Sequence, residues 1–219
     1  MKKKNKKALV WGASLLAAFV LWTVLVCFVD VQAIGPEGSS VGFATLNGYV
    51  HDLTGVNMSL YVITDWLGLV PIGTAFGFAV LGLVQLIKRK SLWKVDHSIL
   101  SLGVFYIVVM AVYVLFETVV INYRPALIDG HLEASYPSST TMLVMCVMPT
   151  AMMQFRARIR NDVFRRCVML ATAVFIAFMV IGRLVSGVHW VTDIIGGALL
   201  SIGIVLICYA ISNIPTENS

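Results

Sequence analysis

The sequence predicts an all-α integral membrane bundle of six transmembrane helices, and three observations support this fold class. The chain has 219 residues, of which 59% are hydrophobic and only 12% are charged, whereas about a quarter of the residues of a soluble domain are charged. Apolar runs of about 20 residues, long enough to cross a bilayer as helices, recur along the chain. Lys and Arg gather in alternate connecting segments. We expect one membrane domain, residues 1–219.

Each predicted span is an apolar run of membrane-crossing length. The six runs are 8–30, 60–87, 99–121, 139–155, 167–185 and 190–212. The first follows the basic tail 1–7 and is too long for a signal peptide, so we expect it to be retained as a helix. Residues 35–58 form an outer loop with turn signals and an amphipathic stretch at 41–53, which is typical of a short helix in the membrane interface.

The distribution of basic residues predicts the orientation. Of the 16 Lys and Arg residues, 14 lie in three segments on one side of the six-span model, namely 1–7, 88–94 and 156–166. The positive-inside rule assigns that side, and both termini, to the cytoplasm. The net charge of +5 is thereby explained by topology, and no nucleic-acid partner is indicated.

The two remaining cations, Arg124 and Arg183, lie on the opposite, outer face. Residues that break a local rule are candidate functional residues, and ionisable groups at membrane depth are costly. Other polar groups are predicted on the same face: His51, Glu117, Asp129, His131, Glu133, His189 and Asp193. We therefore expect any chemistry to occur there, with spans two to six around the site and span one peripheral.

His189 and Asp193 are spaced as neighbours on one helix face. A carboxylate in that position can accept the proton on one imidazole nitrogen and leave the other nitrogen free as a nucleophile or base. The alternative interpretation is an interfacial His beside an Asp that caps a helix start. Arg183 precedes a turn at Ser186–Gly187 and can converge on His189, or it can extend along the membrane interface on its own.

The third outer loop supplies complementary groups. Arg124 is followed by Pro125, and a hydroxyl-rich segment, Ser138 to Thr141, opens the fourth span. The backbone N–H groups at a helix start form an anion site, and guanidinium groups bind phosphate with paired donors. Ordinary N-capping explains the serines but not the arginines. A phosphate site requires Arg124, Ser138, Arg183 and His189 to converge within a few ångströms.

These residues resemble the signatures of the type-2 phosphatidic acid phosphatase (lipid phosphate phosphatase) superfamily. "RLVSGVHWVTD" at 183–193 matches R-x5-H-x3-D, "RP" at 124–125 matches the end of K-x6-RP, and "PSST" at 137–140 is similar to PSGH. The resemblance covers about residues 60–212. It implies that His189 attacks phosphorus, that Asp193 orients it, and that the phosphoryl group is bound by Arg124, Ser138, Ser139 and Arg183. It implies no metal and no cofactor.

Two positions depart from the family pattern. Glu117 stands where the family has Lys, and Thr140 stands where PSGH ends in the His that protonates the leaving group. Three explanations remain open. A substitute acid is supplied by an outer-face group, namely Glu117, Asp129, His131 or Glu133. Alternatively, the substrate is a diphosphate, whose leaving group needs less protonation, or the protein binds lipid phosphates without turnover.

The sequence therefore predicts a membrane phosphatase that hydrolyses a lipid phosphate or polyprenyl diphosphate, such as undecaprenyl diphosphate, at the outer face through a phosphohistidine. The alternative is a catalytically impaired lipid-phosphate-binding or scaffold member. A transporter is disfavoured because paired broken helices are missing from the sequence pattern. The expected partners of the protein are the lipid substrate and membrane lipids, and the sequence leaves open whether it forms a homodimer. We expect a multi-pass protein of a bacterial plasma membrane.

Two further features concern packing and metals. The four cysteines form no CxxC pair, so the pattern indicates neither a zinc site nor a disulfide framework. The GxxxG at Gly73 and Gly77, and the glycines at 196, 197 and 203, predict close helix packing.

Overall fold

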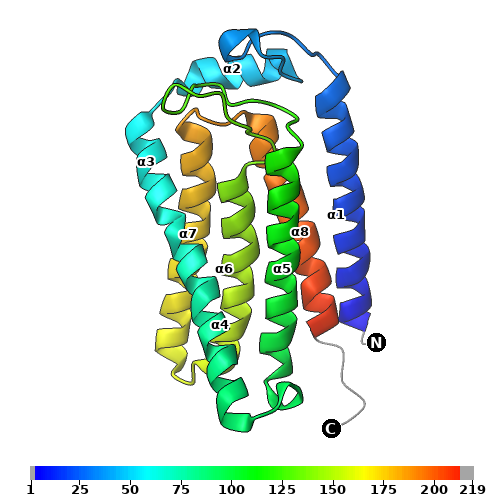
Figure 1. Ribbon diagram of the computed structural model, residues 1–219, viewed down its shortest axis with the longest axis vertical. Coiled ribbons are helices and arrows are strands. Elements are labelled where there is room, and N and C mark those ends of the chain that lie inside the picture. Colours follow the sequence, from blue (N-terminus) through cyan, green and yellow to red (C-terminus); the bar gives the residue numbers. More distant parts are fainter. Residues whose placement is uncertain (1–2, 213–219) are drawn as a thin grey trace.

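In the computed structural model, residues 3–212 are described, and they form a bundle of long helices (Figure 1). No strand occurs in this part of the chain, so the all-α prediction is confirmed. The α-helices are α1 (Lys3–Phe28), α2 (Ala44–Thr54), α3 (Met58–Leu67), α4 (Leu69–Arg89), α5 (His97–Thr118), α6 (Ser139–Arg158), α7 (Asp162–Val185) and α8 (Val191–Ser212). Two short 3₁₀ turns lie at Pro36–Gly38 and Leu92–Lys94.

Five segments within residues 3–212 are long and apolar enough to cross a membrane: α1, α3 with α4, α5, α7 and α8. The remaining predicted span, 139–155, corresponds to α6, which contacts α4, α5, α7 and α8 and buries nine of its 20 residues. A helix surrounded by other helices does not need an apolar surface all round, because little of it meets lipid. The six-span count remains a prediction.

Some boundaries differ from those expected. The predicted second span divides at Gly68, between α3 and α4, where the Gly68 N–H is shared by the carbonyl groups of Thr64 and Asp65. Most of the basic tail 1–7 belongs to a helix, since α1 begins at Lys3. Lys2 lies outside the described residues. The amphipathic stretch of the first outer loop forms α2, as predicted, and α2 lies across the end of the bundle (Figure 1).

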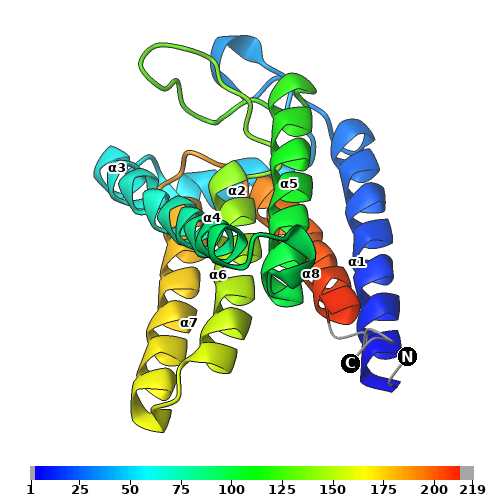
Figure 2. The same ribbon diagram turned by 60° about the horizontal axis from the view of Figure 1, so that its bottom comes forward.

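Helix α1 packs along α8 in both views (Figures 1 and 2). A Cβ added at Gly203 would lie 2.8 Å from a Leu16 side-chain atom, and one added at Gly196 would lie 2.7 Å from the Tyr136 ring. These glycines therefore serve close packing, as predicted. The same prediction is wrong for Gly73 and Gly77. Both are exposed, with no atom within 4 Å of an added Cβ, because their face of α4 turns outward.

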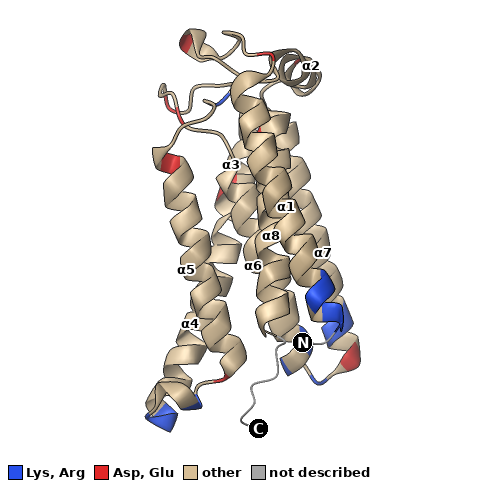
Figure 3. Cartoon of the chain, turned by 90° about the vertical axis from the view of Figure 1, so that its right-hand side faces the viewer, with Lys and Arg blue, Asp and Glu red and all other residues tan. Residues whose placement is uncertain are grey.

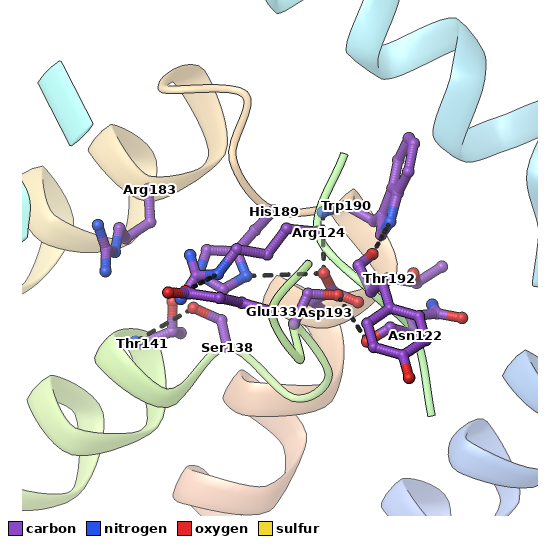
Figure 4. Close-up of polar contacts among 12 residues, drawn as sticks. Asn122, Arg124, Glu133, Ser138, Thr141, Arg183, His189, Trp190, Thr192 and Asp193 are labelled. Carbon is purple, nitrogen blue, oxygen red and sulfur yellow. Dashed lines mark hydrogen bonds and ion pairs between the residues drawn. The ribbon is translucent and has the colours of Figure 1, made fainter. Parts of the chain in front are cut away.

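Charged residues separate along the bundle axis. Figure 3 shows most Lys and Arg at one end of the helices, while the outer-loop end carries mainly acidic residues. This is the charge asymmetry on which the predicted orientation depends. The connection between α5 and α6, which carries Arg124, lies at the end with few basic residues, beside the α7–α8 connection that carries His189 (Figures 1 and 4).

Candidate phosphate site

The centre of the site is a direct contact between residues 65 positions apart in the sequence. Arg124 Nη1 lies 3.2 Å from His189 Nε2. Both side chains are buried, with 7% and 3% of the residue surface exposed. A guanidinium group has no acceptor, so the imidazole Nε2 must accept this hydrogen bond through its lone pair. The convergence of Arg124 on His189 that a phosphate site requires is present (Figure 4).

The other imidazole nitrogen faces a carboxylate. His189 Nδ1 lies 3.6 Å from Asp193 Oδ2, and Asp193 is fully buried. Since Nε2 accepts from Arg124, the proton of a neutral imidazole is on Nδ1 and points toward Asp193. The prediction that His189 and Asp193 are neighbours on one helix face is wrong in one respect. His189 lies in the loop before α8, and only Asp193 is in the first turn of that helix.

The charge state of His189 follows from its surroundings. Burial lowers the pKa of His189 well below its usual value of 6.5, and the positive charges of Arg124 and Arg183 lower it further. The imidazole is therefore neutral at physiological pH, and its Nε2 lone pair is available to an electrophile.

The loop between α7 and α8 is fixed by specific contacts. The Trp190 N–H donates to Asp193 Oδ2 at 2.9 Å, so Asp193 also caps the start of α8. The Trp190 indole donates to the Tyr123 carbonyl at 2.7 Å, which joins this loop to the one that carries Arg124. Gly187 has φ of +66°, and a Cβ there would lie 1.6 Å from the Gly55 carbonyl oxygen. The turn therefore requires glycine.

Arg183 is almost completely buried and has several hydrogen-bond partners. Its residue surface is 1% exposed. Nη2 donates to Thr140 Oγ1 at 2.6 Å and lies 3.1 Å from Asp65 Oδ1. Its guanidinium carbon lies 4.9 Å from the centre of the Tyr61 ring, and that of Arg124 lies 5.9 Å from the same centre. The Tyr61 ring thus contacts both arginines, an arrangement favourable for each cation.

The start of α6 provides the hydroxyl groups. Ser138 is the N-cap, and its fully buried Oγ accepts from the Thr141 N–H at 3.4 Å. Its own N–H donates to the Asp193 carbonyl at 3.2 Å, which ties α6 to α8. Ser139 and Thr140 follow in the first turn and face the adjoining cavity. The capping interpretation is correct for Ser138, and the first-turn amides still form a potential anion site.

A cavity of about 880 Å³ adjoins these residues. Its polar lining residues include Tyr61, Asp65, Glu117, Arg124, Glu133, Ser139, Thr140 and Arg183, and its apolar ones include Leu69, Ile72, Met110 and Leu143. A second cavity of about 420 Å³ lies farther along the same two helices, α4 and α5, and its lining is almost wholly apolar. The cavity with the polar groups therefore lies toward the outer-loop ends of α4 and α5, and the apolar cavity lies farther along the same helices.

The four candidate acids occupy different positions. Glu117, on α5, is exposed and lines the large cavity. Glu133 also lines it, and its Oε2 forms an ion pair with Arg124 Nε at 3.0 Å. Asp129 and His131 belong to an exposed turn of the same loop and are absent from the cavity lining. The geometry therefore favours the two glutamates over the other pair.

Sequence reasoning missed the contribution of α3. Tyr61, Thr64 and Asp65, on adjacent turns of α3, all contact Arg183. None lies in a signature segment. One signal was available, because Asp65 is the only charged residue within the apolar run 60–87, and a carboxylate at membrane depth requires a partner.

Comparisons with known proteins found a match to one family model and one to a solved structure. A family model described as PAP2 superfamily matches residues 121–216. A solved structure, described as the first transmembrane PAP2-type phosphatidylglycerolphosphate phosphatase from Bacillus subtilis, has a TM-score of 0.55 at 18% identity. The match covers 95% of this chain and 98% of that one. Among curated proteins, no sequence matches this chain. The predicted resemblance is confirmed: residues 121–216 match the PAP2 superfamily model, and the chain shares its fold with a solved PAP2-type membrane protein.

Proposed function

We propose that the protein is a membrane phosphatase that hydrolyses a lipid phosphate monoester or polyprenyl diphosphate through a phosphohistidine at His189, at the outer face of a bacterial plasma membrane. The PAP2 match supports a lipid phosphatase at the level of the family. The observation that carries the mechanism is the pair of contacts made by the His189 ring, Nε2 to Arg124 at 3.2 Å and Nδ1 to Asp193 at 3.6 Å.

The steps follow from those contacts. A phosphoryl group entering the cavity takes over the Arg124 and Arg183 donors, which frees the His189 Nε2 lone pair. Nε2 attacks phosphorus, the bond from phosphorus to the lipid oxygen breaks, and Asp193 stabilises the positive imidazole. Water then attacks the same phosphorus, the P–N bond breaks, and inorganic phosphate leaves. The arginines offset the charge on the phosphoryl oxygens, which is the main task in phosphoryl transfer.

A lipid substrate is supported by the shape of the cavities. The polar groups lie at the end of α4 and α5 near the outer loops, and a separate apolar cavity lies farther along the same helices. An ester with its head group among the arginines can direct its hydrocarbon chain toward the apolar residues of α4 and α5, where burial of apolar surface is favourable.

A catalytically impaired lipid-phosphate-binding or scaffold protein is the second candidate. One observation favours it: Thr140, at the position of the family's general acid, donates no proton near neutral pH and accepts from Arg183 instead. Loss of a general acid typically slows a reaction about 10²–10⁴-fold.

The test is phosphate release by the purified full-length protein in detergent, from phosphatidic acid and from undecaprenyl diphosphate. We expect release from at least one substrate and its loss in His189→Ala. The matched control is His97→Ala, because His97 lies at the other end of the bundle, at the start of α5. Binding of phosphatidic acid without turnover supports the second candidate, and turnover that survives in His189→Ala contradicts the proposed mechanism.

A further inference from the structure

The site contains a carboxylate that the family signatures do not provide. Asp65 lies on α3, its side chain is 57% exposed, and it lines the large cavity. Its Oδ1 is 3.1 Å from Arg183 Nη2, and Thr140 Oγ1 is 2.6 Å from the same nitrogen. The Asp65 carboxylate and the Thr140 hydroxyl therefore contact the same nitrogen atom of Arg183. Thr140 is the residue that stands at the position of the family's general acid.

We infer that Asp65 is the proton donor to the leaving oxygen, in place of the missing His. This inference rests on the proposed phosphatase function. Asp65 supplies a proton as the bond from phosphorus to the lipid oxygen breaks, so the lipid leaves as an alcohol. In the second step the resulting carboxylate accepts a proton from the attacking water, which restores the acid.

The proton reaches Asp65 through substrate binding. In the free protein the carboxylate is the ion-pair partner of Arg183. A phosphoryl group that takes over the Arg183 donors removes this partner, and the exposed Asp65 carboxylate then takes up one proton from solvent in the cavity. When inorganic phosphate leaves, the proton returns to solvent and the ion pair with Arg183 forms again. Asp65 thus holds Arg183 in position before binding and acts as an acid afterwards.

The other cavity carboxylates are less well placed. Glu133 pairs with Arg124, whose Nη1 contacts the nucleophilic nitrogen. The leaving oxygen departs in line, opposite the attacking atom, so a group attached to Arg124 is on the side of attack. Glu117 lines the cavity, but within residues 3–212 it forms no hydrogen bond or ion pair with Arg124 or Arg183.

Two roles of Asp65 can be distinguished by measuring how the rate depends on the leaving group. A proton donor matters most for a poor leaving group, whereas a residue that only positions Arg183 matters equally for all leaving groups. We compare Asp65→Asn on phosphatidic acid, whose alkoxide leaving group needs a proton, with p-nitrophenyl phosphate, whose phenolate does not. The expected result is a loss of about 10²-fold or more on phosphatidic acid and of less than about tenfold on p-nitrophenyl phosphate. Asp65→Glu, which keeps the carboxyl group, should recover part of the first loss.

The matched control is Asp52→Asn, since Asp52 is exposed on α2 at the same end of the bundle and lies outside the cavity lining. It should leave both rates unchanged. Equal losses on both substrates in Asp65→Asn, or no loss on either, overturn the inference while the phosphatase function stands. A wild-type protein that hydrolyses only undecaprenyl diphosphate overturns the inference alone, because its leaving group is a phosphate and not an alkoxide. A wild-type protein that hydrolyses none of the three substrates contradicts the phosphatase function itself, and the inference with it.

Discussion

The two halves of the candidate site are built differently. The nucleophile half, Arg124, His189 and Asp193, is buried and held by two loops that contact each other through Trp190. The leaving-group half, Asp65, Glu117 and Thr140, lines the cavity and comes from α3, α5 and α6. The first half carries the family's residues and the second departs from them. In the proposed mechanism, the residues for attack on phosphorus are therefore those that the two loops hold in place, whereas the residues near the leaving group are those that differ from the family pattern.

The largest effect is expected from removing the nucleophile. His189→Ala should lower kcat by about 10⁴-fold or more, because the covalent route is lost and only binding and charge stabilisation remain. The measurement is phosphate release under saturating substrate. A kcat within tenfold of the wild type would remove the nucleophile half from the mechanism.

Asp193→Asn should rank second. An amide can still accept from the Trp190 N–H, so α8 should keep its start, but the negative charge beside His189 Nδ1 disappears. We expect kcat to fall about 10³–10⁴-fold. Circular dichroism should show unchanged helix content, and a loss of helicity would mean that capping was the main role of Asp193.

Arg183→Lys tests the region between the two halves. Lysine keeps the positive charge but cannot contact Tyr61, Thr64, Asp65 and Thr140 at the same time, as Arg183 does. A loss of about 10²-fold in kcat/KM is expected on all substrates. A loss confined to phosphatidic acid would instead place Arg183 with the leaving group.

The pH profile provides a smaller effect with a definite sign. In the proposed mechanism the neutral form of His189 is the active one, and burial and the two arginines lower the pKa of His189 well below 6.5. An unshifted His would lose about tenfold in activity one unit below its pKa. We therefore expect no His189-dependent fall in kcat/KM for p-nitrophenyl phosphate between pH 7 and about 5.5. A fall centred at 6.5 would contradict the described environment.

Thr140→Ala should have the smallest effect. It removes one acceptor from Arg183, which keeps Asp65, Thr64 and the Tyr61 carbonyl. A single hydrogen bond to a charged group is worth about 1.5–3 kcal/mol, and the remaining partners should limit the loss in kcat/KM to roughly tenfold. A larger loss that depends on the leaving group would mean that the Thr140 hydroxyl is needed to position the proton donor, and not only to hold Arg183.

The sequence alone predicted the fold class and the convergence of Arg124 with His189, because apolar run length and misplaced arginines both carry direct physical signals. It did not predict α3 as part of the site. Asp65 stands within an apolar run that is long enough to predict a transmembrane helix, and this prediction draws attention away from the single charged residue. Its partner Arg183 is 118 residues away in the sequence. It also overestimated the packing at Gly73 and Gly77, because a GxxxG pattern does not specify which face of a helix meets a neighbour.

The central claim, that His189 carries the phosphoryl group, is tested most directly by trapping the intermediate. Protein mixed with ³²P-labelled phosphatidic acid and quenched in alkali, where a P–N bond survives, should carry label on the peptide that contains His189. The label should be absent in His189→Ala and present in the His97→Ala control. Turnover without labelled protein, or label on a peptide other than that of His189, would contradict the account.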